Sequence, residues 1–315
     1  MGNASALAPS ARTLGSSRRG RLLATMLAAL ALALAAASLV PARAHAGPPP
    51  RDFMSVTAWG DSISDSDFER LSNSKVTLFR MDLLWLRVEP RPPRADGTHF
   101  YDWSHYDREF RRAARHGVRI LPMVHGSPRW VARKAKYQPK TQLTKAALDA
   151  FVSAAAKRYG PNGSLWKRTP WSTAAPAPSS VRPVYWQIWN EPNTPYNWAG
   201  GPRPKEYAGM LKRVSRALKR AAPSARVMSA GLVWPAIGMT PELYMARMLE
   251  VPGLRGAVDA FAVHPYGNMV FHVMQKVRSA RRTLDVRGAA SEPMSITEIG
   301  WASGPWDGLI VPEPM

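Results

Sequence analysis

The chain has 315 residues, of which 45% are hydrophobic, enough for one large domain with a complete core. It contains no Cys, which excludes disulfides and thiolate chemistry. The formal net charge is +21, and because residues 1–46 hold five Arg and no acidic residue, the remaining 38 basic and 22 acidic residues give +16.

Residues 1–46 have the organisation of a signal peptide. Three Arg between positions 18 and 21 precede an uncharged stretch over residues 22–40, and Ala44-His45-Ala46 offers a cleavage site. The pair Arg18-Arg19 is typical of a twin-arginine export signal. The alternative is an uncleaved anchor, because the uncharged stretch approaches the length that spans a bilayer. We expect cleavage, a secreted protein without a stable membrane span, and a single domain over residues 47–315.

The basic residues suggest an anionic environment. Either they form an ordinary solvated surface or they bind an anionic cell-wall polymer. They are scattered, with no run of five or more, and neither a zinc-finger spacing nor an RNA-binding strand motif occurs. We therefore expect no nucleic-acid partner.

Strands and helices alternate along the chain. In chain order, the predicted elements are a strand at 53–59, a helix at 65–72, a strand at 76–84, a Pro-rich loop at 87–97, a helix at 103–116, a strand at 118–124, a helix at 144–159, a surface insertion at 166–183, a strand at 184–189, a helix at 204–222, a strand at 226–232, a helix at 241–250, a strand at 260–263, a helix at 270–284 and a strand at 294–298.

Most of these strands are short and apolar without alternation, which is typical of a parallel sheet buried on both faces. Regular alternation over about 250 residues predicts an α/β fold, the (β/α)₈ TIM barrel. A doubly wound sheet is the alternative, but no glycine-rich phosphate loop follows the first strand. Polar and aromatic residues also follow nearly every strand, not one switch point.

The predicted barrel lacks a complete eighth unit. Only 15 residues follow Gly300, whereas a βαβ unit takes roughly 30 residues. We expect the eighth βα unit to be truncated or incomplete, with residues 309–311 as a short candidate strand.

The most informative motif follows the fourth predicted strand and reads Trp-Gln-Ile-Trp-Asn-Glu-Pro-Asn over residues 186–193. Its acid, Glu191, ends a buried strand and is costly there without partners. Glu298 ends the seventh predicted strand in a similar setting, three βα units later. On a closed barrel these two strand ends face each other across the mouth. Two facing carboxylates suit glycoside hydrolysis, in which one protonates the leaving oxygen and the other attacks or activates water.

These motifs resemble those of the retaining (β/α)₈ glycoside hydrolases of clan A, nearest to families 39 and 5 (cellulase-like), over residues 53–305 in layout. The residues that carry the resemblance are Asn190-Glu191-Pro192, Thr297-Glu298, His264-Pro265-Tyr266 and Arg80. The clan usually has an aromatic residue at strand eight, where this chain offers only Trp306.

The resemblance implies a role for each site residue. Glu191 is expected to be the acid/base and Glu298 the nucleophile of an O-glycosyl hydrolase acting on a β-linked polysaccharide or oligosaccharide. The implied substrate-binding residues are Asn190 at the sugar 2-hydroxyl, Arg80 and Tyr266 beside the nucleophile, and His264, His125 and Trp301 around the sugar.

Other interpretations remain open. Each site residue could be structural, as a capping acid, an ion-pair partner or barrel-mouth packing. A secreted carbohydrate- or cell-wall-binding protein could use the same fold without turnover. Gly60-Asp61-Ser62 resembles the start of a lipase/esterase family, but the only Asp-x-x-His, at residues 102–105, comes too early. The seven His show no metal-binding spacing, so we expect neither a metal nor a cofactor.

Overall fold

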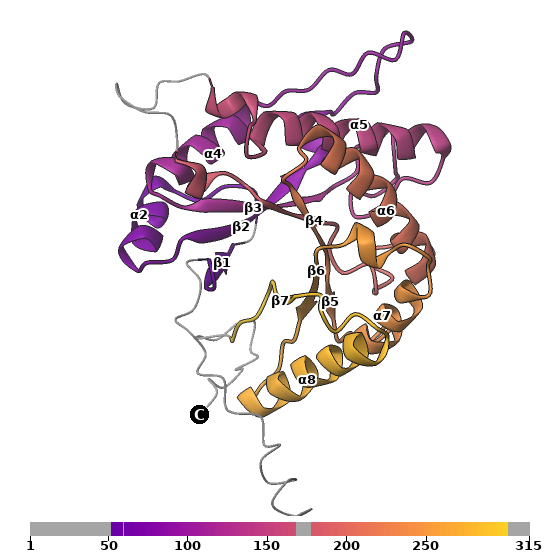
Figure 1. Ribbon diagram of the computed structural model, residues 1–315. Helices are drawn as coiled ribbons and strands as arrows, with labels where there is room; N and C mark the ends of the chain where they lie inside the picture. Colours follow the sequence, from indigo (N-terminus) through magenta and orange to yellow (C-terminus); the bar gives the residue numbers. More distant parts are fainter. Residues whose placement is uncertain (1–51, 59, 168–177, 302–315) are drawn as a thin grey trace, which may run out of the picture. The chain divides into compact units, whose positions relative to one another are not determined.

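The computed structural model describes residues 52–58, 60–167 and 178–301. Within them, seven parallel strands form one curled sheet in which each strand pairs with the next along the chain. The helices lie around the outside of the strands (Figure 1). This is the arrangement of a (β/α)₈ barrel with seven of its strands, so the predicted fold is confirmed. The two edge strands, β1 and β7, do not pair with each other in the part of the chain that the structure describes.

The elements follow the predicted order. The strands are β1 (Ser55–Thr57), β2 (Leu78–Leu84), β3 (Arg119–His125), β4 (Tyr185–Ile188), β5 (Arg226–Val233), β6 (Ala260–His264) and β7 (Met294–Ile296). The α-helices are α2 (Asp65–Asn73), α3 (Trp85–Val88), α4 (Ser104–Arg115), α5 (Gln142–Tyr159), α6 (Pro204–Ala221), α7 (Pro241–Leu249) and α8 (Val270–Val286). The 3₁₀ segments are η1 (Ser164–Trp166), η2 (Ser179–Val181) and η3 (Arg255–Ala257).

Two local features were not anticipated from the sequence. The short helix α3 was not predicted, and its last two residues fall in the predicted Pro-rich loop at 87–97. The N-cap of α4 is Trp103, which makes no capping side-chain bond. The Asp102 carboxylate still accepts the Ser104 N–H at 2.9 Å, so it satisfies a backbone donor next to the helix start.

Several predictions concern residues that the structure does not describe. The predicted signal peptide, the candidate strand at residues 309–311, Trp306 and the middle of the predicted insertion, residues 168–177, are all in this group. Among the described residues, no helix combines the length and the hydropathy needed to cross a bilayer.

The two faces of β2 show how the sheet separates core from site. Phe79, Met81 and Leu83 are at most 1% exposed and belong to the main core. Arg80 and Asp82 alternate with them and therefore point to the opposite face, the barrel interior. A smaller apolar cluster, made of Leu121, Met228, Ala260 and Ala262, lies apart from the main core. The polar residues of β2, Arg80 and Asp82, therefore face the barrel interior, where the candidate site lies.

Candidate active site

The turn that follows β4 contains Glu191, and its backbone is strained. Trp189 has φ 74° and Glu191 has φ 43°, both in the left-handed region that bulky residues avoid. Such residues cost on the order of 1–3 kcal/mol each and persist only where their surroundings hold them. Here the Trp189 N–H donates to the Val124 carbonyl at 2.9 Å, and the Glu191 N–H donates to the Gly231 carbonyl at 3.1 Å. Neighbouring strands therefore fix the position of Glu191.

Asn193 joins the same turn to the residues at and after the end of β5. Its side chain is fully buried, and its amide nitrogen donates to the carbonyls of Val233, at 2.6 Å, and Met239, at 2.8 Å. The Met239 N–H in turn donates to the Asn193 carbonyl at 2.9 Å. These bonds tie the loop after β4 to the loop after β5, a role that we did not assign to Asn193 from the sequence.

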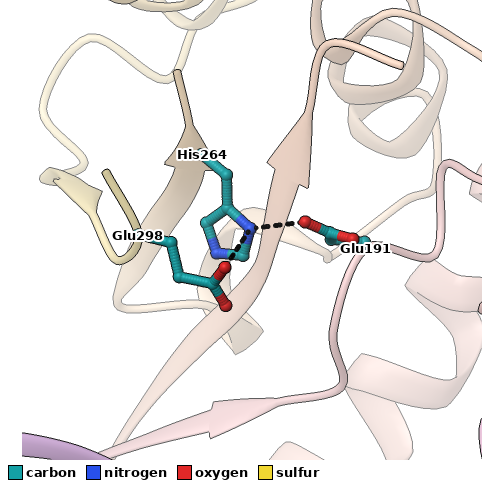
Figure 2. Close-up of side chains that lie close together, drawn as sticks. All are labelled: Glu191, His264 and Glu298. Carbon is teal, nitrogen blue, oxygen red and sulfur yellow. Dashed lines mark hydrogen bonds and ion pairs between the residues drawn. The ribbon is translucent and has the colours of Figure 1, made fainter. Parts of the chain in front are cut away.

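His264 lies between the two carboxylates (Figure 2). Its Nδ1 is 2.9 Å from Glu191 Oε1 and 3.6 Å from Glu298 Oε2, and its ring is completely buried. The other oxygen of Glu191 accepts the Asn197 amide N–H at 3.3 Å. The partners of Glu191 are thus an imidazole and a neutral amide.

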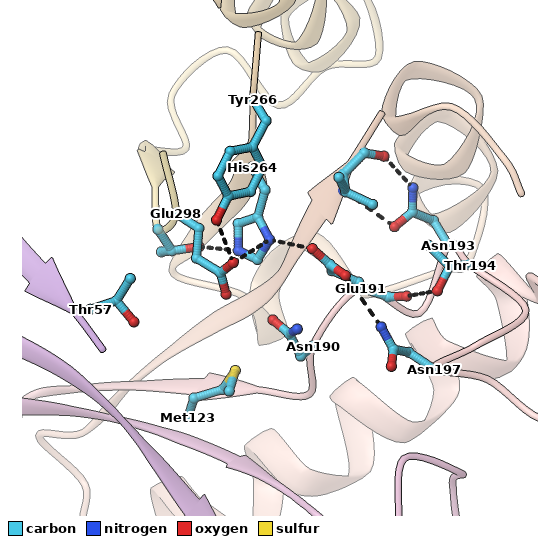
Figure 3. Close-up of polar contacts among 12 residues, drawn as sticks. Thr57, Met123, Asn190, Glu191, Asn193, Thr194, Asn197, His264, Tyr266 and Glu298 are labelled. Atoms are coloured by element: carbon cyan, nitrogen blue, oxygen red, sulfur yellow. Dashed lines mark hydrogen bonds and ion pairs between the residues drawn. The ribbon is translucent and has the colours of Figure 1, made fainter. Parts of the chain in front are cut away.

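Glu298 has partners of a different kind, of which Figure 3 shows Tyr266. Its Oε1 accepts an N–H from the buried Arg80 guanidinium at 2.7 Å, and its Oε2 accepts the Tyr266 hydroxyl at 2.9 Å. Burial raises the pKa of Tyr266 well above its usual value, and the nearby Glu298 raises this pKa further. Tyr266 therefore remains a hydrogen-bond donor. Each oxygen of Glu298 thus accepts one hydrogen bond, an arrangement that suits a carboxylate.

Arg80 joins the two strand ends. Its Nη2 donates to Asn190 Oδ1 at 3.0 Å, and its Nε donates to Gln187 Oε1 at 2.6 Å. One guanidinium thus orients Glu298, Asn190 and the middle of β4 together. Its planar set of donors suits this task better than an ammonium group would.

A buried polar layer lies behind the carboxylates. Because Arg80 can only donate, Gln187 Oε1 must accept, and Gln187 Nε2 then donates to the Ser229 carbonyl at 3.2 Å and to Thr297 Oγ1 at 3.1 Å. The Thr297 hydroxyl is 3.0 Å from His264 Nε2. Arg80 and His264 are therefore connected by a continuous hydrogen-bonded path beneath the site.

Gly231 makes room for His264. A Cβ added at this position would lie 1.9 Å from His264 Nε2, far inside contact distance. Its carbonyl also accepts the Glu191 N–H. The sequence alone gave no signal for this role, because a glycine within an apolar strand usually indicates only a bulge or a close backbone approach.

The structure brings six of the eight predicted site residues into one hydrogen-bonded group, namely Arg80, Asn190, Glu191, His264, Tyr266 and Glu298. His125 lies outside it, with Nε2 3.4 Å from Asp82 Oδ1 on the neighbouring strand. Trp301 is partly exposed, and its buried indole nitrogen has no hydrogen-bond partner among the described residues. Among the described residues, neither His125 nor Trp301 bonds to Glu191 or Glu298. Their contact with a substrate therefore remains a prediction.

The two glutamates and His264 also have the composition of a possible metal site. One ligand atom from each of the three lies within 4.8 Å of the others. However, Glu298 is already neutralised by the Arg80 guanidinium at 2.7 Å, and a cation placed there would face that positive charge. The contacts among these residues thus favour an ion-paired carboxylate pair over a metal centre.

Solved structures share this fold. A monomeric beta-xylosidase from Caulobacter crescentus CB15 is 20% identical with a TM-score of 0.58, over 82% of this chain and 55% of that one. A family 39 glycoside hydrolase from Xanthomonas axonopodis pv. citri is 17% identical with a TM-score of 0.58, over 82% and 53%. An endo-1,4-beta-mannanase from Rhizomucor miehei is 12% identical with a TM-score of 0.52, over 79% and 77%.

These similarities establish the fold, a (β/α)₈ barrel. The chain spans about half the length of the first two proteins. No protein-family model matches the sequence, and no curated protein matches it either.

Proposed function

We propose that this protein is a glycoside hydrolase that uses Glu191 and Glu298 in a retaining double displacement. The observation that carries the proposal is the unequal setting of two neighbouring carboxylates. Glu298 is bound by a guanidinium and a phenol, whereas Glu191 is bound by an imidazole and an amide. Such a difference suits a nucleophile on one side and an acid/base on the other.

The spacing supports retention of configuration. An oxygen of Glu191 and an oxygen of Glu298 lie within 4.8 Å of each other. Retaining enzymes hold their carboxyl groups about 5–5.5 Å apart, whereas inverting enzymes need roughly 6.5–9.5 Å to admit a water molecule. The pair in this protein fits the shorter class.

The reaction then takes two steps. Glu298 attacks the anomeric carbon while protonated Glu191 donates its proton to the departing glycosidic oxygen, which leaves a glycosyl ester on Glu298. Glu191, now ionised, removes a proton from water, and that water displaces the ester and restores both groups. Asn190, oriented by Arg80, is placed to bind the sugar hydroxyl next to the reacting carbon.

The proposal extends to substrate and location. We propose a secreted enzyme that acts on a β-linked polysaccharide or oligosaccharide. Support comes from the signal-like residues 1–46 and from the names of the similar structures, which include a beta-xylosidase and an endo-1,4-beta-mannanase. The net charge of +16 after residue 46 favours an anionic cell-wall polymer as a further partner.

A screen against aryl β-glycosides and cell-wall polysaccharides tests the proposal. The wild-type protein should release sugar or aryl alcohol from at least one of them, and Glu298→Ala should lower that rate by about a thousandfold or more. If wild type and Glu298→Ala bind a polysaccharide equally and neither releases sugar, the protein is a binding protein. Equal release by both would remove Glu298 from the mechanism.

A metal-dependent hydrolase is the second candidate, since Glu191, His264 and Glu298 could hold a cation. A chelator separates the two candidates. Turnover by the ion-paired carboxylates should be unchanged after dialysis against EDTA. A loss of turnover that zinc or another divalent cation restores would favour the metal instead.

A further inference from the structure

The second half of α6 forms one wall of a basic groove, and the connection between α7 and β6 forms the other. The groove has a volume of about 560 Å³ and is lined by Lys212, Ser215, Arg216, Lys219, Arg220, Gly253, Gly256 and Ala257. We call it the α6 groove. Figure 1 shows α6 and α7 side by side on the outer side of the sheet. Because residues 250–259 lead into the amino end of β6, the groove lies at the opposite end of the strands from Glu191 and Glu298.

Three contacts hold the two walls together. The Lys212 ammonium donates to the Pro252 carbonyl, the Ser215 hydroxyl donates to the Ala257 carbonyl at 2.7 Å, and the Lys219 ammonium lies 2.9 Å from an Asp259 oxygen. Because these α6 residues are spaced by three and four, they lie on the same face of the helix. The groove is therefore a fixed feature of the packing between α6 and the segment before β6.

The positive charge of the groove is largely uncompensated. Four of its lining residues are cations, and only Lys219 pairs with an acid. Arg216 and Arg220 are exposed one turn apart, and neither forms a hydrogen bond or ion pair with the described residues. Asp149, a nearby acid, is bound by Arg213 at 2.8 and 3.0 Å, and Arg216 and Arg220 act on the same carboxylate only through their charge, without a hydrogen bond.

The helix dipole explains only part of this cluster. Lys219 and Arg220 lie in the last turn of α6, where cations stabilise the free carbonyl groups. Lys212 and Arg216 lie more than a turn from the Ala221 end, beyond the reach of that effect. Lys212 already bonds to the Pro252 carbonyl, so Arg216 is the cation that neither the dipole nor the wall contacts explain.

We propose that the α6 groove binds an anionic polysaccharide, one that carries carboxylate or phosphate groups. Its volume falls within the range of about 300–1,000 Å³ that is usual for ligand sites. Two adjacent guanidinium groups suit planar carboxylates and phosphates. No aromatic side chain lines the groove, which disfavours single-stranded nucleic acid, whose bases stack on aromatic residues. The choice of a polysaccharide rests on the proposed function; the anion site itself does not.

Binding to polygalacturonate, with inorganic phosphate as a second probe, tests this inference. Titrations use the full-length protein carrying Glu298→Ala, so that no polymer is consumed. The double substitution Arg216→Gln/Arg220→Gln should weaken polygalacturonate binding about tenfold and reduce its dependence on salt concentration. Stronger binding of phosphate than of the polyuronate, lost in the same variant, would assign the groove to phosphorylated polymers.

Arg278→Gln/Arg282→Gln on α8 is the matched control. These two arginines are also exposed and four residues apart, so the net charge changes equally. Equal weakening by both variants, no weakening by either, or a preference for an oligonucleotide would overturn the inference. In protein that retains Glu298, neither pair of substitutions should alter turnover of a neutral aryl glycoside. If the wild-type protein hydrolyses nothing, the proposed function fails while the binding measurement still decides the groove.

Discussion

Gly231 shows how closely the residues of the site depend on one another. Its missing side chain leaves the space that the His264 ring fills, and its carbonyl accepts the N–H of the strained Glu191. His264 in turn contacts Glu191 and lies near Glu298. A residue without a side chain thus places the group between both carboxylates.

Gly231→Ala should therefore disable the site. The added methyl group must displace the buried His264 ring, and overpacking of this kind typically costs 1–3 kcal/mol of stability, roughly. We expect a lower midpoint of chemical denaturation and a large loss of turnover. Gly209→Ala on α6 is the control, since a Cβ there meets nothing within 4 Å. It should raise stability by about 0.5–1 kcal/mol because Ala favours a helix over Gly. A Gly231→Ala protein with wild-type turnover would contradict this account.

Thr297 should set the tautomer of His264. When Glu191 is ionised it can only accept, so His264 Nδ1 should carry the proton and Nε2 should accept the Thr297 hydroxyl. Nitrogen-15 NMR of the wild-type imidazole should show this tautomer.

Thr297→Val should shift these nitrogen resonances and lower the turnover number up to about tenfold, as expected for one lost hydrogen bond. Thr283→Val on α8 removes a hydroxyl whose one partner among the described residues is the Ser279 carbonyl, at 3.0 Å. This variant should change neither the His264 resonances nor the turnover number. Unchanged His264 resonances in Thr297→Val would show that the buried polar layer does not act on the histidine.

Among the elements, the strands could be predicted well and the loops could not. Apolar runs such as residues 118–124 predicted the strands, and Arg80 on β2 was predicted as a site residue. The short helix α3 left no comparable pattern. The Asn193 bonds to the loop after β5 join residues about 40 positions apart, and no local pattern encodes such a contact.

The end of α3 carries a buried acid that should make stability depend on pH. Glu89 is fully buried, accepts the Trp85 indole N–H at 2.7 Å and bonds to His99. Desolvation raises the pKa of Glu89 above its ordinary value of 4.5. At a pH between 4.5 and the raised pKa of Glu89, the folded state holds a proton that the unfolded state has lost. Stability therefore falls as pH rises through this window.

Glu89→Gln should remove that slope, because a neutral amide has no proton to lose. Urea denaturation of both proteins, from about pH 4 to about pH 7, measures the difference. The wild-type unfolding free energy should fall relative to that of the variant as pH rises above 4.5. Parallel curves would show that Glu89 titrates in the folded protein as it does in the unfolded chain.

For the whole molecule, counting βα units predicted the site better than any single motif. The count placed Glu191 and Glu298 three units apart, and the structure brings their oxygens within 4.8 Å. The described residues contain seven strands, and the edge residues Val56 and Ile296 are 39% and 42% exposed. What the count could not supply was the support beneath the site, because Gly231 meets Glu191 and His264 only once the sheet curls. Gln187 likewise reaches Arg80 and Thr297 only in the folded sheet.

The basic residues of the molecule occupy two different settings. Arg80 is buried and neutralised inside the barrel, whereas Arg216 and Arg220 remain exposed on α6. One fold thus separates cations that orient a carboxylate from cations available to a polymer. A total charge from composition could not distinguish these two uses.

The central claim is that Glu298 forms a covalent bond with the sugar. Glu191→Gln cannot deprotonate the water of the second step, so an aryl glycoside with a good leaving group should accumulate the glycosyl ester. Mass spectrometry of the quenched protein should then show one added glycosyl unit, located by peptide mapping at Glu298. Product released by the wild-type protein with inverted configuration, or a glycosyl unit on any other residue, would contradict the account.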